Sequence, residues 1–344
     1  MGTDLKDLAS RKEIEFSDLQ GKRLVVDSMN VIYQFLSSIR QMDGSLLTDS
    51  KGKTTSHLVG LFSRMTKLKK VGMELAFVFD GKKPELKKHE VARRQEVKKQ
   101  AQVEYEIAKE REDVAAMKKY ASRTSQLTKE MIEESKELLE ALGFPVIQAP
   151  SEGEAQAAFM VKQGDFYAEV SQDYDCLLFG VPRMVQNLTL SERKKSKNKL
   201  SYEKTKPVVI ELKDTLKEND ITQDQLIALG LLVGTDFNIG GIKGIGPQKG
   251  LKLVKQFGED FDSLFNEVKW NDFFDFEWKD AFDTIKHMPV TKDYELKWKK
   301  INREKVIEIL VEKHEFSRER VENNLDELEE MQSSGKQKGL GDFF

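Results

Sequence analysis

The feature that most constrains the fold of this chain is a short apolar run that ends in an aspartate. It occurs as KRLVVD over residues 22–27 and again as ELAFVFD over residues 74–80. Runs of this length, rich in β-branched and aromatic residues, predict buried strands. Helical periodicity covers residues 28–40 and 53–70 between the two runs. This alternation predicts an α/β fold in which a mostly parallel central sheet is flanked by helices.

The alternation continues through the middle of the chain. FPVIQ (144–148) and FYAEVS (166–171) are typical of strands, and a helical pattern lies between them. PVVIEL (207–212) indicates a further strand, and the polar segment 187–204 before it is typical of a hairpin or loop.

Mostly helical patterns follow residue 212. We therefore predict an α/β core over residues 1–220, a helical lobe over 221–330 and a flexible tail over 331–344.

The composition narrows the chemistry that the chain can perform. Its 344 residues include a single cysteine, Cys176, and four histidines without ligand spacing. An internal disulfide and a thiolate zinc site are excluded, so carboxylates are left to bind any metal. The lone cysteine fits a reducing, cytoplasmic compartment, and no apolar run approaches the ~18 residues of a membrane span.

The net charge of −3 hides an uneven distribution. Residues 82–99 carry eight Lys or Arg against three Glu, and residues 191–206 carry seven against two. Residues 259–283 carry nine acidic residues against two lysines. Each run alone is typical of a solvated helix face. Together they predict a basic face and an acidic face whose charges cancel in the sum.

Carboxylates stand where several of the predicted strands end. Asp27 and Asp80 close the first two strands, and Asp173 and Asp175 follow a later one. Ligands of open α/β sheets bind outside the carboxyl ends of the strands, so these side chains should share one edge. Asp236, between a helix and a glycine-rich loop, is a further candidate. A single acid in such a place is more often a turn or cap residue.

Two glutamates open the helix in PSEGEAQAAF. One interpretation is a capping box, with Ser151 as the N-cap and Glu154 reaching back to it. The other is that Glu152 and Glu154 both project past the helix end into the acidic edge, because first-turn side chains tilt toward the N-terminus. We expect the cap to form and the second role to matter more.

Seven converging carboxylates would raise one another's pKa unless cations offset their charge. Hard oxygen ligands select Mg²⁺ or Mn²⁺. Two such ions would form a site for in-line attack on a phosphodiester, so the acids predict metal-dependent hydrolysis.

Three further elements suit the binding of nucleic acid. GGIKGIGPQKGLKLV has the form of a helix-hairpin-helix, in which Gly244, Gly246 and Lys249 would approach a phosphate, although a tight turn is the plainer alternative. Lys87 and Arg94 lie two turns apart in a charged helical stretch over 84–122 that has few core residues. They could offset charge on a phosphate, or merely be solvated.

The helix after Asp27 carries Tyr33. Its ring could stack on a base or belong to a core stripe. The last residues of the chain, QKGLGDFF, include two adjacent phenylalanines in a predicted tail, which is typical of a docking peptide that folds on its partner. The spacing of Gln337, Leu340, Phe343 and Phe344 resembles the peptide that binds the sliding clamp of DNA replication.

The chain as a whole resembles a flap endonuclease of the structure-specific 5′ nuclease family, in its archaeal-like form. The resemblance extends from Met1 to Phe344 and is carried by MGTDLKDL, VVDSMNVIYQFL, FVFDGKKPELK, APSEGEAQAAFM, SQDYDCLLFG, GLLVGTDFN and GIKGIGP. It implies a PIN-like α/β nuclease fold with a helical arch over about 82–125 and a helix-hairpin-helix at about 238–258.

The resemblance also implies a role for each candidate residue. The metal ligands would be Asp27, Asp80, Glu152, Glu154, Asp173, Asp175 and Asp236. Lys87 and Arg94 would assist phosphate cleavage alongside Asp175. DNA would be contacted by Gly2, Tyr33, Arg40, Gly244, Gly246 and Lys249, and the sliding clamp by Gln337, Leu340, Phe343 and Phe344.

The implied activity is cleavage of 5′-flap and nicked double-stranded DNA, with a 5′-3′ exonuclease, in replication (Okazaki fragment maturation) and repair. Two Mg²⁺ ions would serve as cofactors, with Mn²⁺ able to substitute, and many members bind K⁺ at the hairpin. A clamp of the proliferating cell nuclear antigen type would be the partner of a monomer. The absence of a basic tail favours a prokaryotic-type cytoplasm, whereas a eukaryotic source would mean the nucleus.

Two alternatives stay open at this point. A non-catalytic DNA-binding scaffold tethered to the clamp would keep the basic stretches and the tail without needing seven acids. A phosphotransferase of the haloacid-dehalogenase type would use DYDC as its D-x-D motif, but Leu177 stands where that family expects Ser or Thr.

Overall fold

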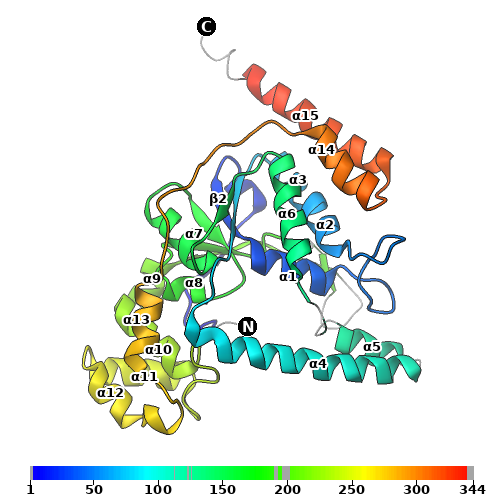
Figure 1. Ribbon diagram of the computed structural model, residues 1–344. Helices are drawn as coiled ribbons and strands as arrows, with labels where there is room; N and C mark the ends of the chain where they lie inside the picture. The colour runs from blue at the N-terminus through cyan, green and yellow to red at the C-terminus, as the bar shows by residue number, and fades with distance from the viewer. Residues whose placement is uncertain are drawn as a thin grey trace.

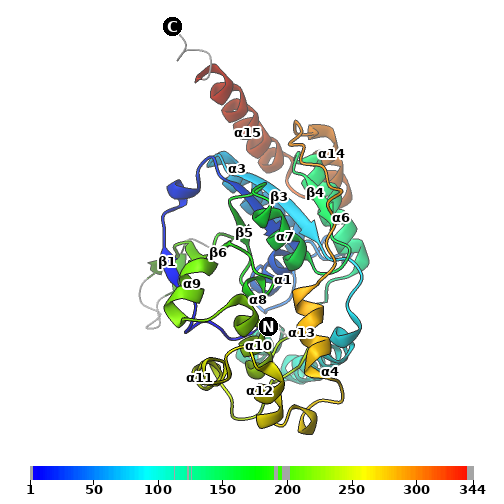
Figure 2. The same cartoon turned by 90° about the vertical axis from the view of Figure 1, so that its left-hand side faces the viewer.

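A computed structural model of the chain describes residues 3–111, 113–121, 124, 126–189, 193–195 and 202–338. At its centre is a seven-stranded sheet in the order β1-β9-β6-β5-β2-β3-β4 (Figure 2). These strands are Arg11–Glu13 (β1), Arg23–Asp27 (β2), Glu74–Phe79 (β3), Val146–Gln148 (β4), Ala168–Val170 (β5), Arg183–Gln186 (β6) and Val208–Glu211 (β9). Strands β6, β5, β2, β3 and β4 are parallel, and β9 and β1 add an antiparallel edge. The predicted mostly parallel α/β sheet is confirmed.

Strand β2 shows why the sheet lies at the centre. Val25 belongs to one apolar cluster, whereas Leu24 and Val26 belong to the other. Successive side chains of a strand face opposite sides, so β2 is buried on both faces. Helices α1 (Ser28–Ser38) and α6 (Lys129–Ala141) contribute to one cluster. The other cluster includes side chains of α7 (Gly153–Lys162), α8 (Asp175–Leu178) and α10 (Gln223–Val233).

The helix predicted over residues 53–70 begins at Ser56. It consists of α2 (Ser56–Gly60), a π-helical turn (Leu61–Met65) and α3 (Thr66–Lys70). A Cβ atom at Gly60 would lie 2.2 Å from the ring of Phe35, so this glycine permits the close approach of α2 to α1.

The charged stretch forms a long helix beside the sheet. A 3₁₀ turn (Glu85–Lys87) leads into α4 (Lys88–Glu110), and α5 (Val114–Ala121) packs against α4. Helix α4 runs below the sheet and past its end (Figure 1). Val103 on α4 is 59% exposed, in keeping with a helix that contributes little to the core.

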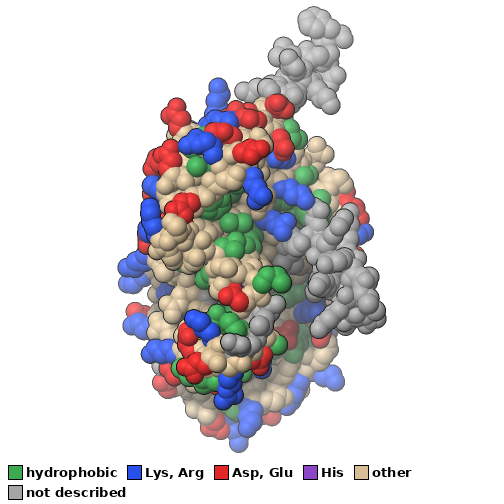
Figure 3. Space-filling model, turned by 90° about the vertical axis from the view of Figure 1, so that its right-hand side faces the viewer, with side chains coloured by type: hydrophobic (Ala, Val, Ile, Leu, Met, Phe, Trp, Pro, Cys, Tyr) green, Lys and Arg blue, Asp and Glu red, His purple; other side chains and the backbone are tan. Residues whose placement is uncertain are grey.

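Polar segment 187–204 contains an antiparallel hairpin of β7 (Arg193–Lys195) and β8 (Tyr202–Lys204), as predicted. On the face shown in Figure 3, Lys and Arg are intermingled with Asp and Glu. On this face the charges are therefore not separated by sign.

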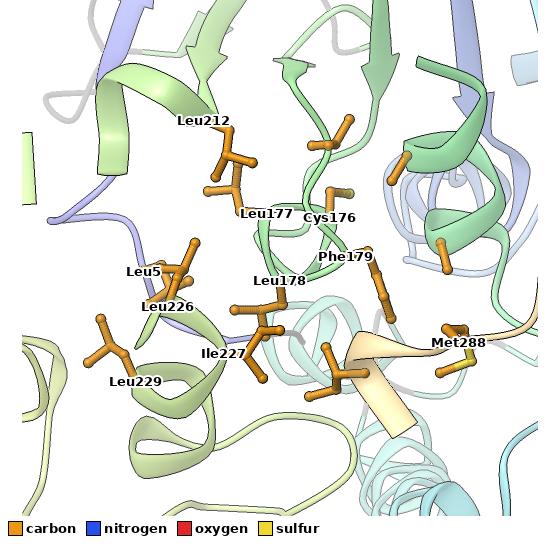
Figure 4. Packing of buried hydrophobic residues seen from close by; sticks show 14 of the residues in the cluster. Leu5, Cys176, Leu177, Leu178, Phe179, Leu212, Leu226, Ile227, Leu229 and Met288 are labelled. Atoms are coloured by element: carbon orange, nitrogen blue, oxygen red, sulfur yellow. The ribbon is translucent and has the colours of Figure 1, made fainter. Parts of the chain in front are cut away.

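Helix α9 (Leu212–Asn219) packs on β9 at the end of the α/β core. The helical lobe begins with α10. It continues through α11 (Pro247–Phe257), α12 (Phe261–Glu267), a 3₁₀ turn (Trp270–Asp272) and α13 (Trp278–Lys286). Leu178 of α8 lies beside Ile227 of α10 in the apolar layer that joins the lobe to the core (Figure 4).

The last two helices of the described chain pack apart from the helices of the lobe. Helices α14 (Arg303–Ile307) and α15 (Arg318–Lys338), joined by a π-helical turn (Glu308–Lys313), lie at the opposite end of the molecule from α11 and α12 (Figure 1). Their apolar residues, including Val306 and Leu325, bury in the cluster of α1 and α6, so they belong with the α/β core. Helix α15 also continues to Lys338, past residue 331 where the tail was expected to begin.

Across the described residues, every helix is too short or too polar to cross a membrane.

Candidate active site

The strand-end aspartates lie where the sequence placed them, and each is tied to a helix start. Asp27 ends β2 and caps α1, because its side chain accepts a hydrogen bond from the amide of Asn30 at 3.1 Å. Asp80 follows β3 and accepts from the amide of Gly153 at 2.8 Å. A Cβ atom at position 153 would lie 2.8 Å from that Asp80 oxygen, so a larger residue there would force the Asp80 carboxylate to move.

The capping box predicted for α7 is wrong. The N-cap residue is Glu152, whose own side chain makes no cap hydrogen bond, and the carboxylate of Asp80 accepts from the first amide of the helix instead. The hydroxyl of Ser151 instead donates to the carbonyl of Lys82 at 3.0 Å and joins two loops. Helix α7 starts one residue later than the capping box would place it, because the amide of Gly153 bonds Asp80. Glu152 and Glu154 therefore lie at the helix start, where their side chains can turn toward the acidic edge.

Asp173 lies in the loop between β5 and α8, and Asp175 is the first residue of α8. One oxygen of Asp175 accepts from both the amide (2.8 Å) and the hydroxyl (2.5 Å) of Thr3. Thr3 was not among the predicted site residues, and the only signal for it was its neighbour Gly2. Gly2 itself lies outside the described residues.

Burial and neighbouring carboxylates raise the pKa of several of these acids. Burial and the charge of Asp80 raise the pKa of Asp27 to about 7. Burial and Asp175 raise the pKa of Asp173 to about 7. The pKa of Glu154 is raised well above its usual value by burial, Asp173 and Asp27. Asp27, Asp173 and Glu154 therefore repel neighbouring carboxylates, and this repulsion is incompletely offset.

Two cations near the N-terminus of α4, Lys87 and Arg94, contact the acids of this edge. The Lys87 ammonium lies 2.5 Å from a Glu152 oxygen and 3.6 Å from Asp236. Burial lowers the pKa of Lys87, but the charges of Glu152 and Asp236 outweigh burial and raise it. A guanidinium nitrogen of Arg94 lies 2.7 and 2.8 Å from the two Asp236 oxygens. Asp236, which follows the C-terminal end of α10, therefore joins the acidic edge from the helical lobe.

Glu90 completes this group and was also missed. It is 3% exposed and accepts hydrogen bonds from Arg94 Nε at 2.5 Å and from Arg93 at 2.8 and 2.9 Å. Residues four apart on a helix are neighbours, so the spacing of Glu90 and Arg94 was the available signal.

The chemistry of the donor set suits a divalent metal ion. The set consists of oxygens alone and carries an excess of negative charge, which suits Mg²⁺. In the part of the chain that is described, no three His, Cys, Asp or Glu side chains are grouped so as to hold a metal ion by themselves. Mg²⁺ keeps several waters and binds through one or two carboxylates, so this looser grouping still fits it.

The predicted DNA-contacting residues are spread around this edge. Tyr33 is 39% exposed, and the Lys98 ammonium of α4 lies 5.2 Å from its ring centre. A core role for Tyr33 is thereby excluded. Arg40 lies where α1 has ended, and its guanidinium donates to the carbonyl of Gly44 at 2.7 Å.

The predicted hairpin precedes α11. Gly244 has a φ of +84°, which favours glycine, and Gly246 is the N-cap of α11. A Cβ atom at either position would meet nothing within 4 Å among the described residues, so the loop is open to a ligand. Lys249 lies in the first turn of α11, 3.4 Å from the carbonyl of Gly244.

Of the four residues expected to bind the clamp, one lies in the described part of the chain. Gln337 lies in the last turn of α15, and Leu340, Phe343 and Phe344 lie outside the described residues.

Known proteins resemble this chain in sequence. Residues 3–101 match the XPG N-terminal domain and residues 143–236 match the XPG I-region. Flap endonuclease 1 of Pyrococcus abyssi is 46% identical over 344 residues, which cover 100% of this chain and 98% of that protein. Flap endonuclease 1 of Thermofilum pendens is 45% identical over 347 residues, covering 100% of this chain and 99% of that protein.

Solved structures resemble it in fold. The flap endonuclease-1 from Methanococcus jannaschii superposes with a TM-score of 0.76 at 38% identity, covering 97% of this chain and 100% of that one. The catalytic core of Rad2, solved in complex with DNA substrate, shares the fold with a TM-score of 0.72 at 22% identity over 95% of this chain and 100% of that one. Because the sequence similarity extends over the whole chain and the fold agrees, this chain belongs to the flap endonuclease family.

Proposed function

We propose that this protein is a structure-specific 5′ flap endonuclease and 5′-3′ exonuclease that acts on branched or nicked DNA. The observation that carries the proposal is that carboxylates at the ends of β2 and β3 and at the starts of α7 and α8 lie near two cations, Lys87 before α4 and Arg94 in α4. Phosphodiester hydrolysis needs both signs of charge, because the acids can hold metal ions while the cations offset charge that develops on the phosphate.

The acidic edge would be the catalytic centre. Its seven carboxylates would hold two Mg²⁺ ions, for which Mn²⁺ can substitute, and the chemistry these supply is Lewis-acid catalysis of in-line hydrolysis that leaves a 5′-phosphate. Asp175 is held from one side by Thr3, which orients its carboxylate without consuming the second oxygen.

Lys87 and Arg94 would act on the scissile phosphate. Both are already placed at the acidic edge by Glu152, Asp236 and Glu90. A phosphate that enters this edge can take over part of their hydrogen bonding, and their charge then stabilises the transition state.

The remaining contacts would recognise the shape of DNA and not its sequence. The open glycine hairpin with Lys249 would bind duplex phosphates, together with K⁺, and Gly2 and Arg40 would contact the substrate near the catalytic edge. The partly exposed ring of Tyr33 would stack on a base. The free 5′ strand would pass the arch formed by α4 and α5.

In the cell, we propose that this monomeric enzyme works in the cytoplasm at replication sites, in Okazaki fragment maturation and repair. Residues Gln337, Leu340, Phe343 and Phe344 would bind a ring-shaped clamp of the proliferating cell nuclear antigen type. Removing residues 339–344 should abolish stimulation by such a clamp while leaving clamp-free cleavage unchanged. Equal stimulation of the truncated and intact chains would contradict this assignment.

The test of the main proposal is cleavage of matched 5′-flap, nicked and single-stranded DNA with and without Mg²⁺. We expect Mg²⁺-dependent cleavage of the flap substrate, strongly reduced in Asp175→Ala. Binding of flap DNA without any Mg²⁺-dependent cleavage would instead indicate a DNA-binding scaffold.

A further inference from the structure

One buried acid lies close to the catalytic edge and has no part in the proposed chemistry. Glu169 is in the central strand β5, opposite Val25 of β2 and Met184 of β6. Its side chain is 0% exposed. One carboxyl oxygen accepts a hydrogen bond from the Cys176 thiol at 3.1 Å, and the other, Oε2, is buried without a hydrogen-bond partner among the described residues.

The surroundings of Glu169 favour its neutral form. Val25 and Met184, its neighbours in register, belong to the apolar layer between the sheet and helices α7 and α8, as does Cys176 (Figure 4). An isolated ionised carboxylate in such a layer is far more costly than a neutral acid. Burial accordingly raises the pKa of Glu169 well above its usual value.

The thiol connects this acid to the catalytic edge. Cys176 is the second residue of α8 and directly follows Asp175. Thr3 holds the Asp175 carboxylate from one side, and the contact between Cys176 and Glu169 anchors the same turn to the central strand. Helix α8 has only four residues. Gln223 of α10 bonds the carbonyls of Leu177 and Leu178 at its far end, whereas the Cys176 thiol is held by Glu169 beside Asp175.

We propose that Glu169 is a positioning residue: a neutral buried acid that, through Cys176, sets the orientation of Asp175 and thereby the affinity of the acidic edge for divalent metal. This inference rests on the proposed function, because it assigns a metal-binding role to Asp175. Groups behind the direct ligands of a metal commonly change its affinity by about 10–100-fold when removed.

The test measures metal binding directly, on the full chain without DNA. Free Mn²⁺ is counted by electron paramagnetic resonance for the wild type and for Glu169→Ala, Glu169→Gln, Cys176→Ala, Cys176→Ser and the double alanine variant. Ile210→Ala is the matched control, because Ile210 is equally buried in the same apolar layer, on strand β9. The midpoint of thermal unfolding is recorded for every variant.

We expect Glu169→Ala and Cys176→Ala each to weaken Mn²⁺ binding by about ten-fold. Glu169→Gln keeps a neutral acceptor and Cys176→Ser keeps a donor, so both should bind Mn²⁺ nearly as the wild type does. The double variant should be no worse than Glu169→Ala, because the two residues act through one contact. Ile210→Ala should lower only the unfolding midpoint.

Three outcomes would overturn the inference. Wild-type Mn²⁺ affinity in Glu169→Ala would leave it a purely structural residue, and equal damage in Glu169→Gln would show that a charge is needed. Additive losses in the double variant would show that the two residues act independently. The proposed function fails separately, if the wild type binds Mn²⁺ but does not cleave flap DNA.

Discussion

At the scale of single residues, Ser151 and Glu154 have roles other than those that a capping box would give them. Ser151 joins two loops through its bond to Lys82, whereas Glu154 is a buried carboxyl held among other acids. Local pattern could predict a helix start near them. It could not predict the N-cap, because that depends on Asp80, which lies far away in the sequence and bonds the amide of Gly153.

The first prediction separates stability from activity at this helix start. Ser151→Ala should lower the free energy of unfolding by about 1 kcal/mol through its lost hydrogen bond, and should retain cleavage. Glu154→Gln should abolish Mg²⁺-dependent cleavage without loss of stability, because it replaces a buried carboxyl with a neutral amide. Thermal unfolding and single-turnover cleavage of flap DNA measure both effects. Full activity in Glu154→Gln would remove this residue from the site.

The second prediction concerns pH. The pKa of Asp27 and of Asp173 rises from 3.8 to about 7 in the fold, through burial and neighbouring acids. The folded state therefore keeps protons that the unfolded chain releases, so these groups reduce stability as pH rises from about 4 to about 7. Without metal, the unfolding midpoint should fall over this range, and Mg²⁺ should raise it more at about pH 8 than at about pH 5. Asp27→Asn should flatten the metal-free profile. An unchanged profile in that variant would contradict the assignment.

At the scale of elements, the 3₁₀ turn before α4 and the first two turns of α4 contact the acidic edge. The sequence predicted a charged helix with few core residues, and the structure adds that Lys87, Glu90 and Arg94 bring it to the acids. The rest of α4 extends past the sheet (Figure 1). Pairing between α4 and Asp236 of the lobe could not be predicted, because it depends on how two distant segments meet.

The third prediction uses a neighbouring pair of arginines on α4. Arg94 and Arg93 both bond Glu90, but among the described contacts only Arg94 reaches Asp236. Arg94→Ala should lower kcat by about 100-fold, whereas Arg93→Ala should remain near the wild type. Glu90→Ala should give an intermediate loss, since Arg94 keeps its bond to Asp236. Single-turnover kinetics on flap DNA provide the measurement. Equal losses in the two arginine variants would indicate a general effect of charge.

At the scale of the whole molecule, the fold and the enzyme class, a metal-dependent DNA nuclease, are confirmed by the family and the matching structure. The phosphotransferase alternative is set aside by the same membership. The packing of α14 and α15 against the cluster of α1 and α6 could not be predicted, because helical periodicity identifies a buried face without identifying its partner. A buried polar cluster helps to hold this C-terminal segment: the His314 ring lies 3.1 Å from both Asp49 and Glu134.

The fourth prediction tests this attachment. His314→Ala should lower the midpoint of thermal unfolding by several degrees, because it leaves Asp49 and Glu134 without their shared partner. Metal-dependent cleavage below that midpoint should be retained, since the cluster belongs to the C-terminal attachment and not to the acidic edge. Lys305→Ala, which removes a more exposed ion pair on α14, is the matched control and should change the midpoint little. Equal midpoints for the two variants would show that the cluster does not stabilise the fold.

The strands and the aspartates at their ends can be predicted from the sequence alone, because the alternation of strand and helix patterns is a local property. That alternation favours parallel strands, whose carboxyl ends meet at one edge of the sheet, so the shared edge could be predicted too. Only the tertiary structure decided that Thr3 orients Asp175, that Arg94 meets Asp236 and that α15 returns to the core. Each of these contacts joins residues more than a hundred positions apart. Their partners are selected by the packing of the whole chain, and no local periodicity records that selection.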